Sequence, residues 1–145
     1  SDVYKRQGWY RLRFEVPERN EGRRCTLLFD GAMSHARVYV NGREAIRWPN
    51  GYNSFHTDIT PLLNPGGENL LAVRLENLPE SSRWYPGAGI YRNVHLIVTD
   101  EAHVPVWGTQ IITRRADEAS ARVRQCTALA VPQGKSPPTM RSKRR

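Results

Sequence analysis

Apolar and polar residues alternate along several short stretches of the chain, which is the pattern of β-strands that bury one face. The first stretch begins after Trp9, where Tyr10, Leu12, Phe14 and Val16 fall on one face and charged residues on the other. The same period returns in residues 25–29, 36–40, 71–75 and 94–98. The sequence therefore predicts a series of short strands, each with one face in a core.

Turn signals separate these stretches. Asn41-Gly42 directly follows residues 36–40, and this dipeptide favours a type I′ turn because both central residues need a positive φ. We therefore predict a hairpin over residues 36–47. No segment has a sustained 3.6-residue apolar period with helix caps, so the alternation and the closely spaced turns predict an all-β sandwich or barrel.

Three segments lack the strand pattern. Residues 77–89 carry two prolines and two glycines and are expected to form a long loop. Residues 110–113 are interpreted as a connector, and residues 121–124 alternate as though another strand begins there. Residues 128–145 are rich in Pro, Gly, Ser and basic residues without an apolar period, which predicts a disordered basic C-terminal tail.

A net charge of +8 and a pI of about 10.1 are typical of nucleic-acid-binding proteins. The charge lies mainly at one end, because residues 1–113 hold 13 Lys and Arg against 12 Asp and Glu, whereas residues 114–145 hold 9 against 2. A nucleic-acid binder carries its cations on a folded face, so we expect no nucleic-acid partner. The alternative predicts salt-dependent binding that survives removal of residues 114–145.

The length of 145 residues suits one domain and is too short for a complete (β/α)8 barrel, which needs roughly 200 residues. We expect no membrane partner, because no run of about 18 apolar residues occurs and the N-terminus lacks the apolar segment of a signal peptide. Cys25 and Cys126 are too few and too far apart for a disulfide framework or a zinc site, and the histidines show no ligand spacing. We expect no metal and no cofactor.

Four segments occur in order and at close spacing: GWYRLRFEVP, LLFDGAMSHARVYVNGRE, FHTDITPLLNPGGENLLAVRLEN and SRWYPGAGIYRNVHLIV. Together they resemble the N-terminal sugar-binding domain of glycoside hydrolase family 2, which includes β-galactosidases, β-glucuronidases and β-mannosidases. The last segment is most similar to bacterial β-galactosidase relatives. The resemblance implies a jelly-roll β-sandwich of the galactose-binding-domain type with eight or more strands, in agreement with the strand pattern.

The resemblance also implies a larger polypeptide, in which this domain precedes an immunoglobulin-like domain and a (β/α)8 barrel. In the family the barrel supplies two glutamates for a retaining reaction, and such a pair lies roughly 5 to 5.5 Å apart. No catalytic residue is assigned in this chain, which is expected to be inactive alone. Its partners would be a β-galactoside-like carbohydrate and those two domains. The compartment stays open, with the periplasm favoured over the cytoplasm because many bacterial relatives are exported.

The predicted organisation has four parts. Residues 1–7 form a leader that does not resemble the family, and residues 8–109 form the jelly-roll sugar-binding domain. Residues 110–127 form a linker and the truncated start of the immunoglobulin-like domain, and residues 128–145 form the tail. Which sugar is preferred, the oligomeric state and whether both ends are native stay open.

The predicted substrate-binding residues are Asn77, Arg83 and Trp84, in the loop of residues 77–89. Aromatic rings stack on the apolar faces of sugars, and Arg and Asn form hydrogen bonds to sugar hydroxyls. The alternative is that Arg83 and Trp84 only pack this loop against its surroundings. Trp9 is interpreted as a structural residue at the edge of the sandwich.

A second loop group, consisting of Trp48, Asn50, Tyr52 and Asn53, has a lectin-like composition. Ordinary loop packing is the favoured interpretation there. For the whole chain, the leading hypothesis is the N-terminal part of a β-galactosidase-like glycosidase, and the alternative is a free-standing carbohydrate-binding module. Autonomous sugar binding at millimolar concentration would favour the module.

Overall fold

The structure is a computed structural model, and it describes residues 7–16, 22–77 and 87–132. Contacts between residues divide the chain into two compact units, residues 1–98 and residues 99–145. The first unit contains β1 (Gln7–Glu15), β2 (Arg23–Phe29), β3 (Ala32–Met33), β4 (Ala36–Val40), β5 (Arg43–Trp48), β6 (Phe55–Asp58), β7 (Glu68–Glu76), β8 (Gly89–Ile90) and β9 (Val94–Asp100), the last of which crosses the division. Among the described residues the helical structure is one 3-10 turn, η1 (Thr60–Leu62).

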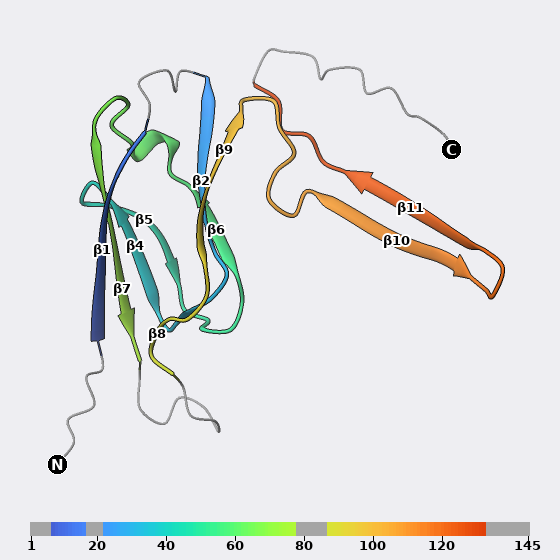
Figure 1. Cartoon of the computed structure of the whole chain (residues 1–145), viewed down its shortest axis with the longest axis horizontal. Coiled ribbons are helices and arrows are strands. Elements are labelled where there is room, and N and C mark those ends of the chain that lie inside the picture. The colour runs from blue at the N-terminus through green and yellow to red at the C-terminus, as the bar shows by residue number, and fades with distance from the viewer. Residues whose placement is uncertain (1–6, 17–21, 78–86, 133–145) are drawn as a thin grey trace. The chain divides into compact units, whose positions relative to one another are not determined.

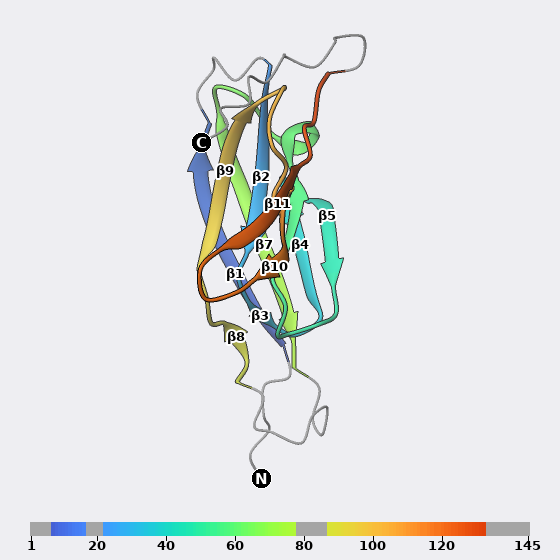
Figure 2. The same ribbon diagram turned by 90° about the vertical axis from the view of Figure 1, so that its right-hand side faces the viewer.

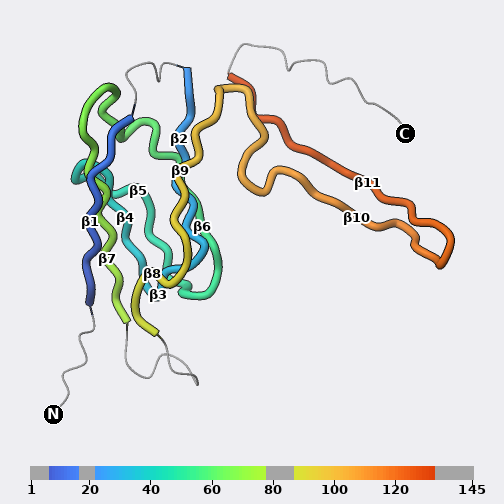
Figure 3. The backbone as a smooth tube through the Cα atoms, viewed as in Figure 1, coloured from blue at the N-terminus to red at the C-terminus, as the bar shows by residue number. Residues whose placement is uncertain are grey.

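The strands of the first unit form two facing sheets (Figure 1). One sheet has the order β1-β7-β4-β5 and the other the order β6-β2-β9, while β3 and β8 pair separately as a short ribbon. Every pairing with a described register is antiparallel. Apart from the β4–β5 hairpin, the chain passes from one sheet to the other between strands, a path that can be followed in Figure 3. The predicted all-β sandwich is confirmed.

The core lies between the two sheets and is built from the alternating residues of β2, β4, β6 and β7. The rings of Phe29 and Phe55 stack with centroids 4.8 Å apart, and they join the two neighbouring strands β2 and β6. The other fully buried large side chains are Ile59, Val38, Val40, Val73, Asn69 and Cys25. The alternation predicted for residues 25–29 is thus confirmed, because Cys25, Leu27 and Phe29 are all buried.

The predicted hairpin is present, with Val40 opposite Arg43 across the turn. Its two central residues have positive φ, 51° at Asn41 and 77° at Gly42, as a type I′ turn requires. Asn41 also donates a hydrogen bond from Nδ2 to Oδ1 of the buried Asn69, at 2.8 Å. The turn that closes the hairpin is thus tied to the start of β7.

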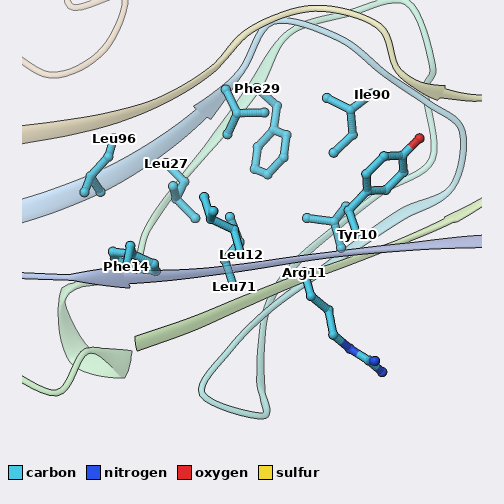
Figure 4. Close-up of a pocket in the computed structure, with 11 residues that line it drawn as sticks. Tyr10, Arg11, Leu12, Phe14, Leu27, Phe29, Leu71, Ile90 and Leu96 are labelled. Carbon is cyan, nitrogen blue, oxygen red and sulfur yellow. The ribbon is translucent and has the colours of Figure 1, made fainter. Parts of the chain in front are cut away.

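The structure differs from the prediction on one face of β1 and of β9. Leu12 is 60% exposed and Leu96 is 41% exposed, although their alternation predicts burial. β1 and β9 are the edge strands of their sheets, and an apolar groove of about 320 Å³ lies between them. Figure 4 shows Tyr10, Leu12 and Phe14 of β1 directed into this groove, and Arg11 directed to the opposite side.

The second unit contains the antiparallel hairpin β10 (Thr109–Ala116) and β11 (Ala121–Thr127), in which Cys126 is half-buried. The strand expected at residues 121–124 is confirmed, but the connector expected at residues 110–113 is wrong because those residues pair with β11. The carboxylate of Asp117 accepts hydrogen bonds from the backbone N–H groups of Ala119 and Ser120. These bonds hold the pKa of Asp117 below its ordinary value.

Part of the predicted tail is described. Within residues 128–132, Ala130 pairs with His103, with one backbone hydrogen bond in each direction of 3.0 and 2.8 Å. Residues 133–145 lie outside the described residues, as do residues 1–6 of the predicted leader. Gln7, the last residue of that leader, begins β1. The predicted domain boundaries stay a prediction.

Candidate functional site

One end of the sandwich carries a small, mainly apolar hollow with a few polar side chains beside the β3–β8 ribbon, and Figures 1 and 2 both show these two strands at that end. The ribbon pairs Ala32 with Ile90 and Met33 with Gly89. The hollow has a volume of about 220 Å³, and we call it the polar end pocket. It is lined by Gln7, Gly8, Tyr10, Met33, Leu75, Asn77, Ala88 and Gly89.

Met33 forms part of the pocket wall and is held in place by the loop after β5. A Cβ atom at Gly51 would lie 2.8 Å from Cγ of Met33, so glycine allows the loop to approach this side chain. The hydroxyl of Tyr91 donates a hydrogen bond of 2.7 Å to the carbonyl oxygen of Gly51. The loop after β5 is therefore held against Met33 of β3 and is also hydrogen-bonded to Tyr91, which follows β8.

Asn77 reaches the pocket because the end of β7 is anchored just before it. The backbone N–H of Glu76 donates to the carbonyl oxygen of Ser34 at 2.9 Å, and the hydroxyl of Ser34 donates to the carbonyl oxygen of Glu76 at 2.8 Å. This reciprocal pair fixes the last residue of the strand. Asn77 follows it directly, with its side chain half-buried and its Oδ1 atom buried.

The opposite wall of the pocket depends on the close approach of Gly89 and Tyr10. Gly89 has φ 135°, and a Cβ atom there would lie 2.9 Å from the hydroxyl oxygen of Tyr10. Any larger residue would push that ring away. The pocket therefore gathers the phenol of Tyr10 and the amide of Asn77, groups that can form hydrogen bonds with hydroxyls, while the side-chain amide of Gln7 accepts a hydrogen bond from Arg74.

The lining residues of the polar end pocket include no carboxylate, imidazole, thiol or amine. General acid–base catalysis needs a group that exchanges a proton near the operating pH, and a retaining glycosidase needs two carboxyl groups. The pocket as described can bind and orient a hydroxyl-rich ligand. It offers no pair of groups for hydrolysis.

The sequence predicted three substrate-binding residues, and the structure describes one of them. Asn77 lines the polar end pocket. Arg83 and Trp84 fall in residues 78–86, outside the described residues, so their role stays a prediction. Sequence reasoning missed Gln7 and Tyr10, because only the pairing of β1 with β7 brings them beside Asn77.

The second predicted loop group has packing roles. Trp48 stacks on Phe55 of the core, with ring centroids 5.6 Å apart. Oδ1 of Asn50 accepts hydrogen bonds from the backbone N–H groups of Tyr52 and Asn53, at 2.8 and 3.3 Å. Such a side-chain bond closes a turn. The interpretation as ordinary loop packing is confirmed for Trp48 and Asn50.

Across residues 7–16, 22–77 and 87–132 the structure brings together no group of three or more His, Cys, Asp or Glu side chains that could hold a metal ion. The same described part of the chain has no helix long and apolar enough to cross a membrane.

Two facing antiparallel sheets with a small pocket at the end of their strands define the class as a β-sandwich domain with a candidate ligand site. The chain belongs to the glycosyl hydrolases family 2, sugar binding domain, whose family model matches residues 2–100. The matched range begins inside the predicted leader and covers every strand of the first unit.

Curated relatives carry the same region within much longer chains. A β-galactosidase of Bacteroides ovatus is 42% identical over 123 residues, which is 84% of this chain and 14% of that protein. A β-galactosidase of Thermoanaerobacter pseudethanolicus is 34% identical over 113 residues, which is 72% of this chain and 15% of that protein. The chain therefore spans about one-seventh of these relatives.

Solved structures agree with the fold. A β-glycosidase from Bacteroides vulgatus superposes with a TM-score of 0.81 at 32% identity, covering 89% of this chain and 17% of that one. A glycosyl hydrolase family 2 member from Bacteroides cellulosilyticus gives a TM-score of 0.79 at 37% identity, covering 85% and 17%. The jelly-roll sandwich predicted from the resemblance is confirmed, and the chain corresponds to a short part of the length of such proteins.

Proposed function

We propose that this chain is the N-terminal sugar-binding part of a retaining β-glycosidase of the β-galactosidase type, and that its polar end pocket contacts the terminal sugar of the substrate. The observation that carries the proposal is the position of Asn77. Its side chain lines one pocket with Tyr10, and Arg83 and Trp84 follow it in the sequence, within the predicted loop of residues 77–89. The β-galactosidase relatives of 42% and 34% identity support this substrate class, and other relatives of 28% to 37% identity are named as β-glucuronidases.

In this proposal the chain binds and another part of the same polypeptide hydrolyses. The two glutamates of a retaining mechanism stand roughly 5 to 5.5 Å apart, and they would come from a barrel outside this chain. Trp84 would stack on the sugar ring, while Asn77 and Arg83 would form hydrogen bonds to its hydroxyls. The β10–β11 hairpin would be the first part of the immunoglobulin-like domain.

The test is steady-state kinetics of the longer polypeptide that contains this chain, with a nitrophenyl β-galactoside as substrate. Asn77→Ala is expected to raise KM about three- to tenfold with little change in kcat, because it removes one or two hydrogen bonds made equally to substrate and transition state. Gln110→Ala, which removes an exposed amide from β10, is the matched control and should leave both constants unchanged. An unchanged KM for Asn77→Ala would refute the assigned contact.

A free-standing carbohydrate-binding module is the second candidate. It is favoured by one observation, that all residues lining the polar end pocket come from the first unit. Titration of the 145-residue chain with methyl β-galactoside separates the two. Saturable binding at millimolar concentration, lost in Asn77→Ala, supports the module, whereas no binding by the chain alone supports the divided site.

A further inference from the structure

The outer face of the four-stranded sheet carries two aromatic rings that meet over its second strand. Trp9 on β1 and Tyr39 on β4 both flank β7, where their partners in the register are Arg74 and Ala72. Because Ala72 has only a methyl group, the two rings can approach across it, and their centroids lie 5.9 Å apart with an interplanar angle of 30°. We call this pair the aromatic platform.

The aromatic platform is partly open to solvent, because Tyr39 is half-buried and Trp9 is exposed. Trp9 is 47% exposed, although a tryptophan usually contributes most of its large apolar surface to a core. Figure 4 shows that Arg11, the next outward residue of β1, points away from the apolar groove and hence to the same outer face. Its guanidinium carbon lies 5.9 Å from the centroid of the Trp9 ring.

The charges around the platform are mainly positive. The two central rows of the face run Trp9, Arg74, Arg37 and Arg47, then Arg11, Ala72, Tyr39 and Glu44, as the registers of β1, β7, β4 and β5 show. Four arginines therefore stand against one glutamate in these two rows. Such an excess favours an anionic ligand.

Two of these arginines are already paired with carboxylates. Arg47 pairs with Glu44 and holds the pKa of that carboxyl group below its ordinary value. Arg74 pairs with Glu76 at 3.1 Å and also donates to Oε1 of Gln7 at 2.9 Å. Both pairs fix charge within the sheet.

Arg11 and Arg37 form no salt bridge with a carboxylate among the described residues, although the charge of Arg37 also contributes to the lowered pKa of Glu44. In the register they occupy one diagonal of the square whose other diagonal is formed by Trp9 and Tyr39. β1 and β4 lie on either side of β7, so they are roughly 10 Å apart, which is twice the spacing of neighbouring strands. The face thus offers a stacking surface with a cation on each side.

We propose that the aromatic platform binds an acidic polysaccharide, with one pyranose ring stacked on Trp9 and Tyr39 and uronate carboxylates paired with Arg11 and Arg37. Ring faces of sugars carry C–H groups that stack on aromatic rings, and a guanidinium pairs with a carboxylate through two parallel hydrogen bonds. The apolar groove offers no comparable set of donors. The site is separate from the polar end pocket and independent of the proposed function.

Calorimetric titration of the 145-residue chain with the trisaccharide of galacturonic acid tests the proposal. The matched ligand is the same trisaccharide with its carboxyl groups methyl-esterified, which keeps the rings and removes the charge. We expect the acid to bind at least tenfold more tightly than the ester, and the difference to shrink as salt screens the charges.

Trp9→Ala and Arg37→Gln are each expected to weaken the binding at least fivefold. The matched controls are Trp107→Ala and Arg124→Gln, which remove the same residue types from the second unit and should bind as the unchanged chain does. Thermal melting followed by circular dichroism verifies that each variant is folded. If Trp9→Ala is unstable, Arg37→Gln still tests the site, because it alters no core residue.

The proposal is overturned if acid and ester bind alike, or if folded Trp9→Ala and Arg37→Gln bind like the unchanged chain. It is also overturned if inorganic sulfate or double-stranded DNA displaces the acidic trisaccharide at equal charge concentration, because the face would then be a general anion patch.

Discussion

Asn69 shows how much one buried polar side chain can hold together. It is 0% exposed, and its Oδ1 accepts hydrogen bonds from Nδ2 of Asn41 and from the backbone N–H of Asn64, at 2.8 and 2.7 Å. Its Nδ2 donates to the carbonyl oxygens of Asn64 and Gly67, at 3.1 and 3.0 Å. Two turns of the first unit, at residues 41–42 and 64–67, therefore depend on a single amide.

Replacing this amide should be costly. Asn69→Ala leaves several buried partners without a hydrogen bond, so we expect the free energy of unfolding to fall by about 2–4 kcal/mol. Urea denaturation followed by tryptophan fluorescence measures the change. Asn93→Ala, which alters an exposed asparagine, should stay within about 0.5 kcal/mol. A similar value for both variants would contradict the assigned role of Asn69.

At the same scale, the candidate site was only partly predictable. The loop composition pointed to Asn77, because amides bind hydroxyls and the loop is rich in polar and aromatic residues. Gln7 and Tyr10 gave no such signal, since they stand in a strand pattern that indicates structure. They join Asn77 only through a pairing between residues about 70 positions apart in the chain.

Among the elements, the β4–β5 hairpin depends on the backbone of its turn. Gly42 has φ 77°, a region where a side chain is strained even though a Cβ atom there would meet open space. Gly42→Ala is therefore expected to lower the free energy of unfolding by about 1 kcal/mol. Gly8→Ala is the control, because that glycine has open space and no positive φ, and its stability should be unchanged or slightly raised.

The same urea titration measures both glycine variants. Equal losses in Gly42→Ala and Gly8→Ala would mean that strand propensity, and not the turn, sets the cost. A loss well above 2 kcal/mol would instead show that the neighbouring Asn41 network is disturbed as well.

Strands with a clear period were predictable, because a strand that buries one face carries apolar residues at every second position. β7 and the β4–β5 hairpin are confirmed in this way. β10 was missed since its residues Ile111 and Ile112 are adjacent and are followed by polar residues, which gives no alternation. For β1 and β9 the period is present and the strands are confirmed, but the predicted burial fails at Leu12 and Leu96.

At the scale of the whole molecule, the apolar groove is a departure from a closed sandwich. Exposed apolar surface binds amphipathic dyes, so the chain should enhance the fluorescence of anilinonaphthalene sulfonate under native conditions. Leu12→Asn is expected to reduce this signal by at least half with little loss of stability, because Leu12 is 60% exposed. Ile111→Asn, at a residue 66% exposed in β10, should leave it unchanged.

Equal dye signals from Leu12→Asn and Ile111→Asn would show that the groove does not bind the dye. No local pattern could have predicted the groove, since it arises where the edges of two sheets face each other. At this scale the sequence predicted a jelly-roll domain of a longer family 2 protein, from four segments in register. The family match agrees with this prediction, and the chain spans about one-seventh of the length of its relatives.

One cysteine lies in each of the two units, so thiol labelling can follow the opening of the sandwich over time. Cys25 is 0% exposed in the core of the sandwich, whereas Cys126 is half-buried in the hairpin of the second unit. A thiol reagent can reach Cys25 only when the sandwich opens. The rate at which Cys25 is labelled therefore times the opening of the sandwich, and the partly exposed Cys126 supplies a reference rate in the same sample, without any engineered probe.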